Sequence, residues 1–229
     1  MPCLSIIMPV LDEAKEIADA LAALSPLRAR GAEIIVVDGG SRDGTPDLAR
    51  ALADRLVVAP RGRAAQMNAG ARVAQGDVFV FLHVDTRLPA NADRLVFEGL
   101  RSGSVWGRFD VSIAGENMLL PVIAAFMNWR SRLTGIATGD QAIFVSREAF
   151  AQVGGFPEIA LLEDITLTAR LKHVSRPINL REHVTTSGRR WEQHGVVRTT
   201  LLMWRLRLAY FLGADPTRLA RRYGYVPPE

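Results

Sequence analysis

The N-terminal part of the chain, up to Asp85, alternates short, continuously apolar segments with segments whose apolar residues recur at helical spacing. Continuous apolar runs are typical of strands that are buried on both faces of a sheet. The predicted strands are 4–10, 33–38, 55–59 and 77–82, and the predicted helices between them are 13–24, 45–53 and 62–74. This order predicts a parallel sheet with helices on both faces, in a chain of 229 residues that is 48% hydrophobic.

The second half of the chain departs from this regular alternation. Segment 104–113 has the alternating pattern of a strand in a mixed sheet, and 140–146 predicts a further strand. Helices are predicted at 117–133, 147–156, 163–174 and 194–222. We therefore expect one domain, residues 1–195, and a basic amphipathic helical extension of the same domain, residues 196–229.

Polar side chains follow all four predicted strands of the first half. Parallel sheets bind ligands outside the carboxyl ends of their strands, so polar residues at several strand ends indicate a site. In chain order they are Asp12 and Glu13, Asp38, Arg61 and Arg63, and His83 and Asp85.

The strand ends 38 and 61–63 have residue types that suit a nucleotide. Asp38 enters a turn with two glycines, where a carboxylate can accept an N–H of a nucleobase. Arg61 and Arg63 precede a predicted helix whose N-terminal amides favour an anion such as a diphosphate. The alternatives are an ordinary strand-to-helix turn and arginines on a surface loop.

The segment "VFVFLHVDT" ends a buried strand with an imidazole and a carboxylate two residues apart. Asp85 offers a hard oxygen ligand for Mg²⁺ or Mn²⁺, and in an extended segment His83 points to the same side. Imidazole suits Mn²⁺ better than Mg²⁺. The alternative is a histidine with a structural hydrogen bond near a helix start.

Two later segments carry candidate catalytic residues. Asp164 follows Glu163 at the start of a predicted helix, where it could act as a general base or only stabilise the helix dipole. Segment 186–195, predicted to be a loop, contains Arg190 and Trp191. Arginine can neutralise a leaving diphosphate and tryptophan can stack on a sugar, whereas the alternative is a surface cation–π cluster.

Together these motifs resemble the family 2 glycosyltransferases, over about residues 4–195. The resemblance rests on "SIIMPVLDEAKEI", "IIVVDGGSRDGT", "GRAAQMNAGARVAQGDVFVFLHVDT" and "GGFPEIALLEDITLTARL". It implies the α/β GT-A fold, a Rossmann-like nucleotide-diphospho-sugar transferase with a mixed, mainly parallel sheet. It also implies inverting, divalent-cation-dependent (Mn²⁺ or Mg²⁺) transfer from a UDP- or GDP-sugar donor to a hydroxyl acceptor, lipid-linked or a small molecule.

The resemblance also assigns roles by position. The residues that it places at the nucleotide are Pro9, Asp12, Glu13, Asp38, Arg63 and Asp85. Asp85 matches the last carboxylate of the family's Asp-x-Asp metal motif, in which His83 replaces the first aspartate. Asp164 matches the catalytic base, and Arg190 with Trp191 matches half of a Gln-x-x-Arg-Trp motif, with Ser187 in the glutamine position.

The C-terminal segment 196–213 is apolar over much of its circumference, with arginines interspersed and Trp204, Tyr210 and Phe211 among the apolar residues. Such a segment suits a membrane interface, so we expect peripheral contact through 196–222. A helix packed on the domain and a dimer interface are equal alternatives. The N-terminus lacks a signal-peptide pattern and Cys3 is the single cysteine, which predicts a cytoplasmic protein, peripheral on the inner face of the cytoplasmic membrane.

The sequence also bears on three other functions. A sugar-nucleotide pyrophosphorylase would have a glycine-rich basic loop after the first strand, where this chain has "PVLDEAKE". A catalytically degenerate GT-A fold that binds a nucleotide or a partner stays an alternative because of His83. No nucleic-acid partner is expected, because the basic residues lack the interleaved aromatic residues of an RNA-binding sheet.

Overall fold

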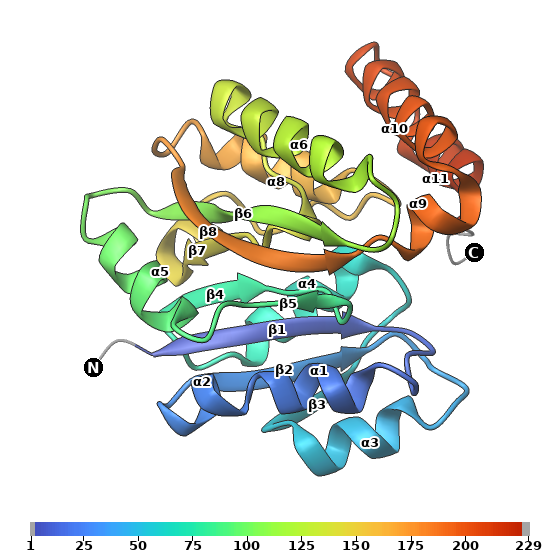
Figure 1. Cartoon of the computed structure of the whole chain (residues 1–229). Coiled ribbons are helices and arrows are strands. Elements are labelled where there is room, and N and C mark those ends of the chain that lie inside the picture. Colours follow the sequence, from blue (N-terminus) through green and yellow to red (C-terminus); the bar gives the residue numbers. More distant parts are fainter. Residues whose placement is uncertain (1–2, 226–229) are drawn as a thin grey trace.

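The computed structural model describes residues 3–225, and they form one curled sheet covered by helices on both faces (Figure 1). The strand order is β3-β2-β1-β4-β7-β6-β8-β5. The strands are β1 (Leu4–Val10), β2 (Glu33–Asp38), β3 (Arg55–Val58), β4 (Val78–Phe81), β5 (Thr86–Arg87), β6 (Trp106–Ala114), β7 (Phe144–Ser146) and β8 (Ile178–Ser187).

The helices before β6 are α1 (Ile17–Ala23), α2 (Ser25–Ala29), α3 (Thr45–Leu52), α4 (Arg63–Val73) and α5 (Ala92–Leu100). The later ones are α6 (Leu120–Thr134), the 3₁₀ turn η1 (Gly139–Gln141), α7 (Arg147–Gln152), α8 (Glu163–Leu171), α9 (Arg189–His194), α10 (Val196–Phe211) and α11 (Pro216–Tyr223).

The first four strands of this order are parallel, as the alternating pattern predicted. β1 pairs with β2 from Ser5↔Glu33 to Val10↔Asp38, and it pairs with β4 on its other side. β7 runs antiparallel to both β4 and β6, whereas β6 and β8 are parallel. The expected mixed, mainly parallel sheet is therefore confirmed, and the carboxyl ends of β1 and β8 lie at the same edge (Figure 1).

Alternate side chains of each central strand enter different core layers, because a strand's side chains alternate between faces. Ile6 and Met8 pack with α1, α5 and α6 on one face, whereas Ile7 packs with α4, α7 and α8 on the other. All three side chains have no exposed surface. Continuous apolar strands are thus explained by helices on both faces of the sheet.

Several elements differ from the sequence prediction. The helix expected from residue 13 begins at Ile17, and segment 186–195 is not a loop, because β8 ends at Ser187 and α9 follows. β5, α5 and β8 were not predicted. β8 has Arg181, Glu182 and His183 exposed in succession, so its sequence lacks the apolar alternation on which a strand prediction depends.

The C-terminal helices pack against the domain through a small third cluster. Leu206 of α10 contacts Leu219 of α11 and Leu161 of the loop before α8 within this cluster. Thr166 of α8 and the Tyr210 hydroxyl of α10 are hydrogen-bonded at 2.7 Å. Residues 226–229 of the predicted extension lie outside the described residues, and the boundary at 195 stays a prediction. Among residues 3–225, no helix combines the length and apolarity that a membrane span requires.

Candidate active site

A polar cavity of about 410 Å³ lies at the carboxyl ends of β1 and β4. Basic side chains line it from the β3–α4 connection and from α9, and acidic ones line it from the loops after β1 and β4. Of the residues predicted to bind nucleotide or metal or to act in catalysis, it brings together Pro9, Glu13, Arg63, His83, Asp85, Arg190 and Trp191.

An apolar cavity of about 340 Å³ adjoins the polar cavity, between α6, α8 and α10. Its walls include Phe126 and Met127 of α6 and Leu206 of α10, and the acidic start of α8 closes one side with Glu163 and Asp164. The two cavities share walls, which are formed by Arg63, His83, Asp140, Trp191, Met203 and Tyr223. The predicted base Asp164 therefore lies next to the predicted nucleotide side.

Asp12 and Asp38, by contrast, do not line the polar cavity. Asp38 is buried, and its carboxylate accepts hydrogen bonds from the amides of Gly40 (2.9 Å) and Ser41 (3.0 Å). The Asp12 carboxylate accepts one from the Arg42 amide at 2.7 Å. Both carboxylates stabilise the turn after β2. A nucleoside that bound either carboxylate would therefore compete with the backbone amides of this turn for its oxygens.

Gln66 of α4 lies between the carboxyl ends of β1 and β2, and the sequence analysis did not identify it as a site residue. Its Nε2 donates to the carbonyls of Val10 and Val37 at 2.8 Å each, so it ties the end of β1 to β2. The side chain is buried and lines the polar cavity. The available signal was a lone amide in the alanine-rich segment "RAAQMNAGA", on the helix that follows Arg63.

His83 lies against the turn η1 of the chain segment 138–141. Its Nδ1 is 3.5 Å from Oδ1 of Asp140, and a Cβ on Gly139 would stand 2.6 Å from the imidazole. Any larger residue at 139 would therefore have to displace the imidazole of His83. Burial raises the pKa of Asp140, but the contact with His83 and the charges of Arg63 and Arg207 outweigh burial and lower it overall.

Asp85 faces the same cavity from the loop after β4, near Glu13 of the loop after β1. The pKa of Glu13 is raised by burial and by the charges of Glu16 and Asp85, against the opposing charge of Arg189. Carboxylate and imidazole ligands fit a divalent cation at this point. Within residues 3–225, no three His, Cys, Asp or Glu side chains converge on a metal position.

Glu163 and Asp164 have different surroundings although they are adjacent. Asp164 accepts hydrogen bonds from the Gly139 amide (2.8 Å, Oδ2) and the Ile165 amide (2.7 Å, Oδ1). Glu163 is buried, and burial together with the charge of Asp164 raises its pKa to about 7, although Arg63 opposes this. The arrangement pairs a fixed, hydrogen-bonded carboxylate with a carboxyl that titrates near neutrality.

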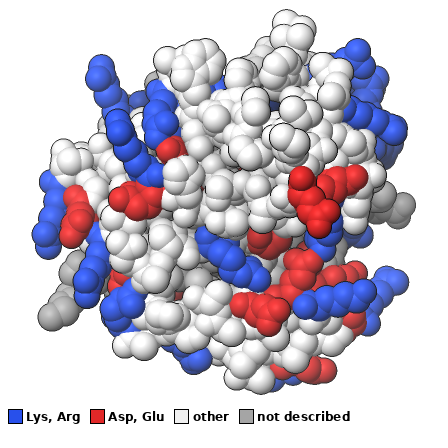
Figure 2. All heavy atoms as spheres, in the orientation of Figure 1, with Lys and Arg blue, Asp and Glu red and all other residues white. Residues whose placement is uncertain are grey.

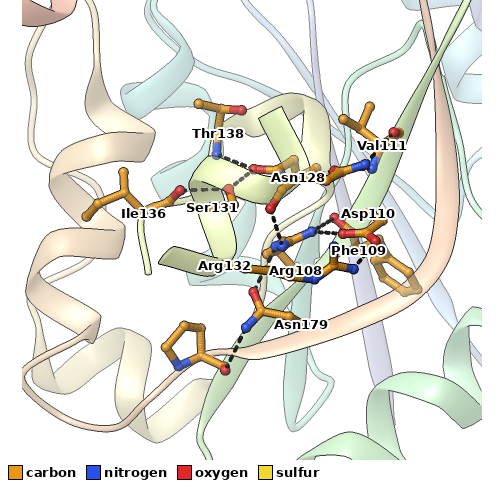
Figure 3. A network of polar contacts seen from close by, with 12 residues as sticks. Arg108, Phe109, Asp110, Val111, Asn128, Ser131, Arg132, Ile136, Thr138 and Asn179 are labelled. Carbon is orange, nitrogen blue, oxygen red and sulfur yellow. Dashed lines mark hydrogen bonds and ion pairs between the residues drawn. The ribbon is translucent and has the colours of Figure 1, made fainter. Parts of the chain in front are cut away.

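A buried polar network holds η1 in place (Figure 3). Ser131 of α6 donates to Oε1 of Gln141 at 2.6 Å, and Asn128 of α6 exchanges two hydrogen bonds with the backbone of Val111 in β6. Below them Arg108 of β6 donates to the Asn128 carbonyl at 3.2 Å and pairs with Asp110. The turn that presents Gly139 and Asp140 is thus fixed by α6 and β6.

The C-terminal end of the described chain closes the polar cavity. Nη2 of Arg190 donates to the Tyr223 carbonyl at 2.7 Å, and its guanidinium lies 3.6 Å from the centre of the Tyr223 ring. Trp191 is 5% exposed and lines both cavities. Sequence reasoning placed Arg190 and Trp191 at a site but gave Tyr223 no role there.

The sequence matches the family described as Glycosyl transferase family 2 over residues 5–151, which is more than half of the chain. The chain belongs to glycosyl transferase family 2. The predicted fold and family are therefore confirmed, and the predicted enzyme class is that of the family.

Solved structures with the same fold support this assignment of architecture. The mannosyltransferase PcManGT from Pyrobaculum calidifontis, in complex with GDP-Man and Mn²⁺, has a TM-score of 0.63 at 24% identity, covering 99% of this chain and 66% of that one. S. aureus TarS 1-349 has a TM-score of 0.63 at 17% identity, with 80% and 60% covered. Glucosyl-3-phosphoglycerate synthase from Mycobacterium tuberculosis, with Mn²⁺, UDP and glucosyl-3-phosphoglycerate, has a TM-score of 0.60 at 20% identity, with 81% and 71% covered.

This family 2 glycosyltransferase thus spans 60% of the TarS chain and 66% of the mannosyltransferase chain that it matches. Curated proteins give no significant match. At sequence identities of 17–24%, these solved structures show only that the fold is the same. The alignment with the mannosyltransferase covers 99% of this chain and therefore includes the C-terminal helices. The roles of individual site residues stay predictions.

Proposed function

We propose that the protein transfers a sugar, with inversion, from a UDP- or GDP-sugar in the polar cavity to a hydroxyl acceptor in the apolar cavity. The observation that carries this proposal is the place of Asp164. Its carboxylate lines the apolar cavity, and the amide of Gly139, the residue before Asp140 of the shared wall, holds it there at 2.8 Å. A base at this junction can take a proton from a hydroxyl that attacks a sugar on the other side.

The polar cavity has the charge that a nucleoside diphosphate requires. Arg61, Arg63 and Arg190 line it, and the amino end of α4 opens onto it at Gly62 and Arg63. Guanidinium groups and helix amides bind phosphate oxygens and stabilise the negative charge that grows on a leaving diphosphate. The solved mannosyltransferase and synthase were crystallised with GDP-Man and UDP respectively, which keeps both bases as candidates here.

Asp85 and His83 would hold a divalent cation, with Mn²⁺ or Mg²⁺ as the candidates. Such a cation supplies further neutralisation of the leaving diphosphate. Asp85 lines the polar cavity from the loop after β4. Asp140 pairs with His83 and so positions the imidazole ring. The alternative is a catalytically degenerate fold, which would bind the nucleotide in the same way but would not transfer a sugar.

The base assignment is tested with Asp164→Asn, which keeps the size of the side chain and removes its basicity. We expect release of UDP or GDP from nucleotide sugars, with simple alcohols as acceptors, to fall by about 10²- to 10⁴-fold. Asp19→Asn, an exposed aspartate on α1, is the matched control and should retain wild-type rates. Wild-type rates in the Asp164 variant would contradict the assignment.

Donor binding is measured separately by calorimetry of UDP and GDP, each with and without Mn²⁺. We expect one nucleotide to bind with Mn²⁺, to lose at least tenfold in affinity in Asp85→Ala, and to bind equally well in Asp164→Asn. Binding without transfer in the wild type would favour the degenerate fold. Absence of binding for both nucleotides would contradict the proposed function.

We also propose that the protein contacts a membrane surface peripherally, in keeping with a lipid-linked acceptor as one candidate. Exposed apolar side chains form what we call the α6–α10 surface, and Phe126 of α6 lies 5.5 Å from Trp204 of α10, ring centre to ring centre. Figure 2 shows a broad uncharged area where α6 lies, with basic side chains at its margins. The surface comprises Val122, Phe126, Trp129, Leu133, Leu201, Trp204, Leu208 and Phe211.

An anionic phospholipid surface suits this combination, because aromatic and aliphatic side chains enter the interface while arginines meet lipid headgroups. Arg198 and Arg205 of α10 and Arg218, Arg221 and Arg222 of α11 are exposed beside it. We expect sedimentation with phosphatidylglycerol vesicles at low salt, reduced in Trp129→Glu and Leu208→Glu. Val58→Glu replaces an equally exposed apolar residue on β3 and should bind as the wild type does. If the protein instead stays in the supernatant and is a dimer, we would conclude that the α6–α10 surface binds a second copy of the chain.

A further inference from the structure

The apolar cavity contains buried hydrogen-bond donors that no described residue satisfies. Nε and Nη2 of Arg130, on α6, are buried and have no hydrogen-bond partner in residues 3–225, and the same holds for Nε1 of Trp191. Both residues line this cavity. A buried polar group without a partner is costly, and a buried guanidinium is costlier, so proteins rarely keep one without a use.

A second arginine lies beside the first. Arg207 of α10 also lines the cavity, and no hydrogen bond or ion pair joins its guanidinium to another described residue. Burial and the nearby charge of Arg207 lower the pKa of Arg130 to about 10, which still leaves its guanidinium charged at neutral pH. Two guanidinium groups in the wall of one cavity, neither of them directly paired with a described carboxylate, form a site for an anion.

The acidic groups of the same cavity act on these arginines through charge, since Asp164 opposes the lowering of the Arg130 pKa and Arg207 lowers the pKa of Asp140, but they are bound elsewhere. Asp140 pairs with His83, and Asp164 accepts hydrogen bonds from the Gly139 and Ile165 amides. Glu163 has a pKa of about 7 and so carries only part of a charge near neutrality. No ion pair joins any of the three to Arg130 or Arg207 among residues 3–225.

The chemistry of the unpaired groups restricts the ligand. Guanidinium and indole N–H groups only donate hydrogen bonds, so their partner must accept, and two guanidinium groups favour an acceptor with negative charge. The part of the wall formed by α6 and α10 is largely apolar, with Ile123 and Phe126 from α6 and Leu206 from α10. The ligand therefore combines an anionic oxygen group with an apolar body.

We propose that the acceptor carries a phosphate or carboxylate group that binds Arg130 and Arg207, and an apolar body that lies between α6 and α10. The identity of the ligand as the acceptor rests on the proposed function, whereas the anion site itself does not. Anchoring the acceptor by its charged group would leave its hydroxyl free to approach Asp164, which lines the same cavity. Arg130 and Arg207 are then specificity-determining residues for the acceptor.

The test uses hexyl phosphate as the probe, with hexanoate, inorganic phosphate and 1-hexanol beside it, and measures binding to the full chain by calorimetry. We expect hexyl phosphate or hexanoate to bind at least tenfold more tightly than either inorganic phosphate or 1-hexanol. The better of the two identifies the anion as phosphate or carboxylate. Equal binding of 1-hexanol would overturn the proposal.

Variants locate the site. Arg130→Gln and Arg207→Gln should each weaken binding of the better probe at least tenfold, and Arg130→Lys should retain part of it because the charge remains. Arg205→Gln removes an exposed arginine one half-turn away on α10 and should leave the affinity unchanged. Unchanged affinity in Arg207→Gln would overturn the proposal even if Arg130→Gln does not fold.

Two further arms separate this inference from the proposed function and identify the source of the anion. Asp164→Asn should bind the probe as the wild type does, so probe binding in a protein that binds neither UDP nor GDP would refute the proposed function and keep the anion site. If Arg130→Gln also lowers sedimentation with phosphatidylglycerol vesicles, the anion is a lipid headgroup. If sedimentation is unchanged while probe affinity falls, the acceptor is a soluble anion.

Discussion

At the residue scale, the start of α8 shows how two neighbouring carboxylates acquire different properties. Leu162 precedes the helix with a left-handed backbone (φ 69°) and is followed by Glu163 and Asp164. Asp164 accepts a hydrogen bond from the Gly139 amide, whereas Glu163 enters a buried place that disfavours its charged form. The sequence indicated an acidic helix start and singled out Asp164, whereas the different surroundings of the two carboxyl groups came only from the structure.

We expect Glu163→Gln to change the pH dependence of stability. The folded-state pKa of Glu163, about 7, lies above the unfolded value of 4.5, so the folded state holds more protons between these values and stability falls as pH rises through 7. Glutamine stays neutral throughout. Thermal unfolding should therefore show variant and wild type alike at pH 4, and the variant more stable at pH 8, on the order of 2 kcal/mol. If the stabilities of the variant and the wild type changed in parallel from pH 4 to 8, the raised pKa of Glu163 would be contradicted.

At the element scale, α6 positions the site although it contributes no predicted catalytic residue. Its Asn128 and Ser131 hold β6 and η1 together, and the pair Arg108–Asp110 underlies them in the core (Figure 3). Arg108 is 1% exposed and Asp110 is 4% exposed. A fully buried pair of this kind fixes the register of β6 against its neighbours but depends on both partners.

Asp110→Ala should therefore destabilise the protein by about 3 to 5 kcal/mol, because it leaves a buried guanidinium without its counter-charge. Urea unfolding measures the change. Asp47→Ala is the matched control, since Asp47 pairs with Arg50 on the exposed face of α3, and it should cost less than about 1 kcal/mol. A double replacement, Arg108→Met with Asp110→Leu, should recover most of the loss. If Asp110→Ala and Asp47→Ala lowered the free energy of unfolding equally, the stabilising role of the Arg108–Asp110 pair would be contradicted.

At the scale of the whole molecule, segments distant in sequence meet around the two cavities. The tail returns so that Tyr223 packs under Arg190 and lines both cavities, next to residues from the ends of β1 and β4. The C-terminal helices therefore take part in the site, and Trp204 of α10 belongs both to the lining of the apolar cavity and to the α6–α10 surface. Figure 1 shows α9, α10 and α11 together at the edge where β8 ends.

We expect Tyr223→Leu to weaken binding of the donor nucleotide about tenfold, because Arg190 loses the ring that orients its guanidinium. Tyr223→Phe keeps the ring and should bind nearly as the wild type does. Calorimetry with the nucleotide found to bind the wild type compares the two. Similar losses in both variants would assign the effect to the hydroxyl instead, and no loss in either would remove the tail from the site.

The sequence by itself determined the parallel half of the sheet, the family and the strand ends that bear polar residues, because continuous apolar runs and the residues after them are local properties. The tertiary structure decided what those residues face. It turned the carboxylates of Asp12 and Asp38 into the turn after β2, and it brought Gly139 to Asp164. It also brought Arg130 and Arg207 together from α6 and α10. Such encounters depend on how helices pack across long loops, and no spacing along the chain encodes them.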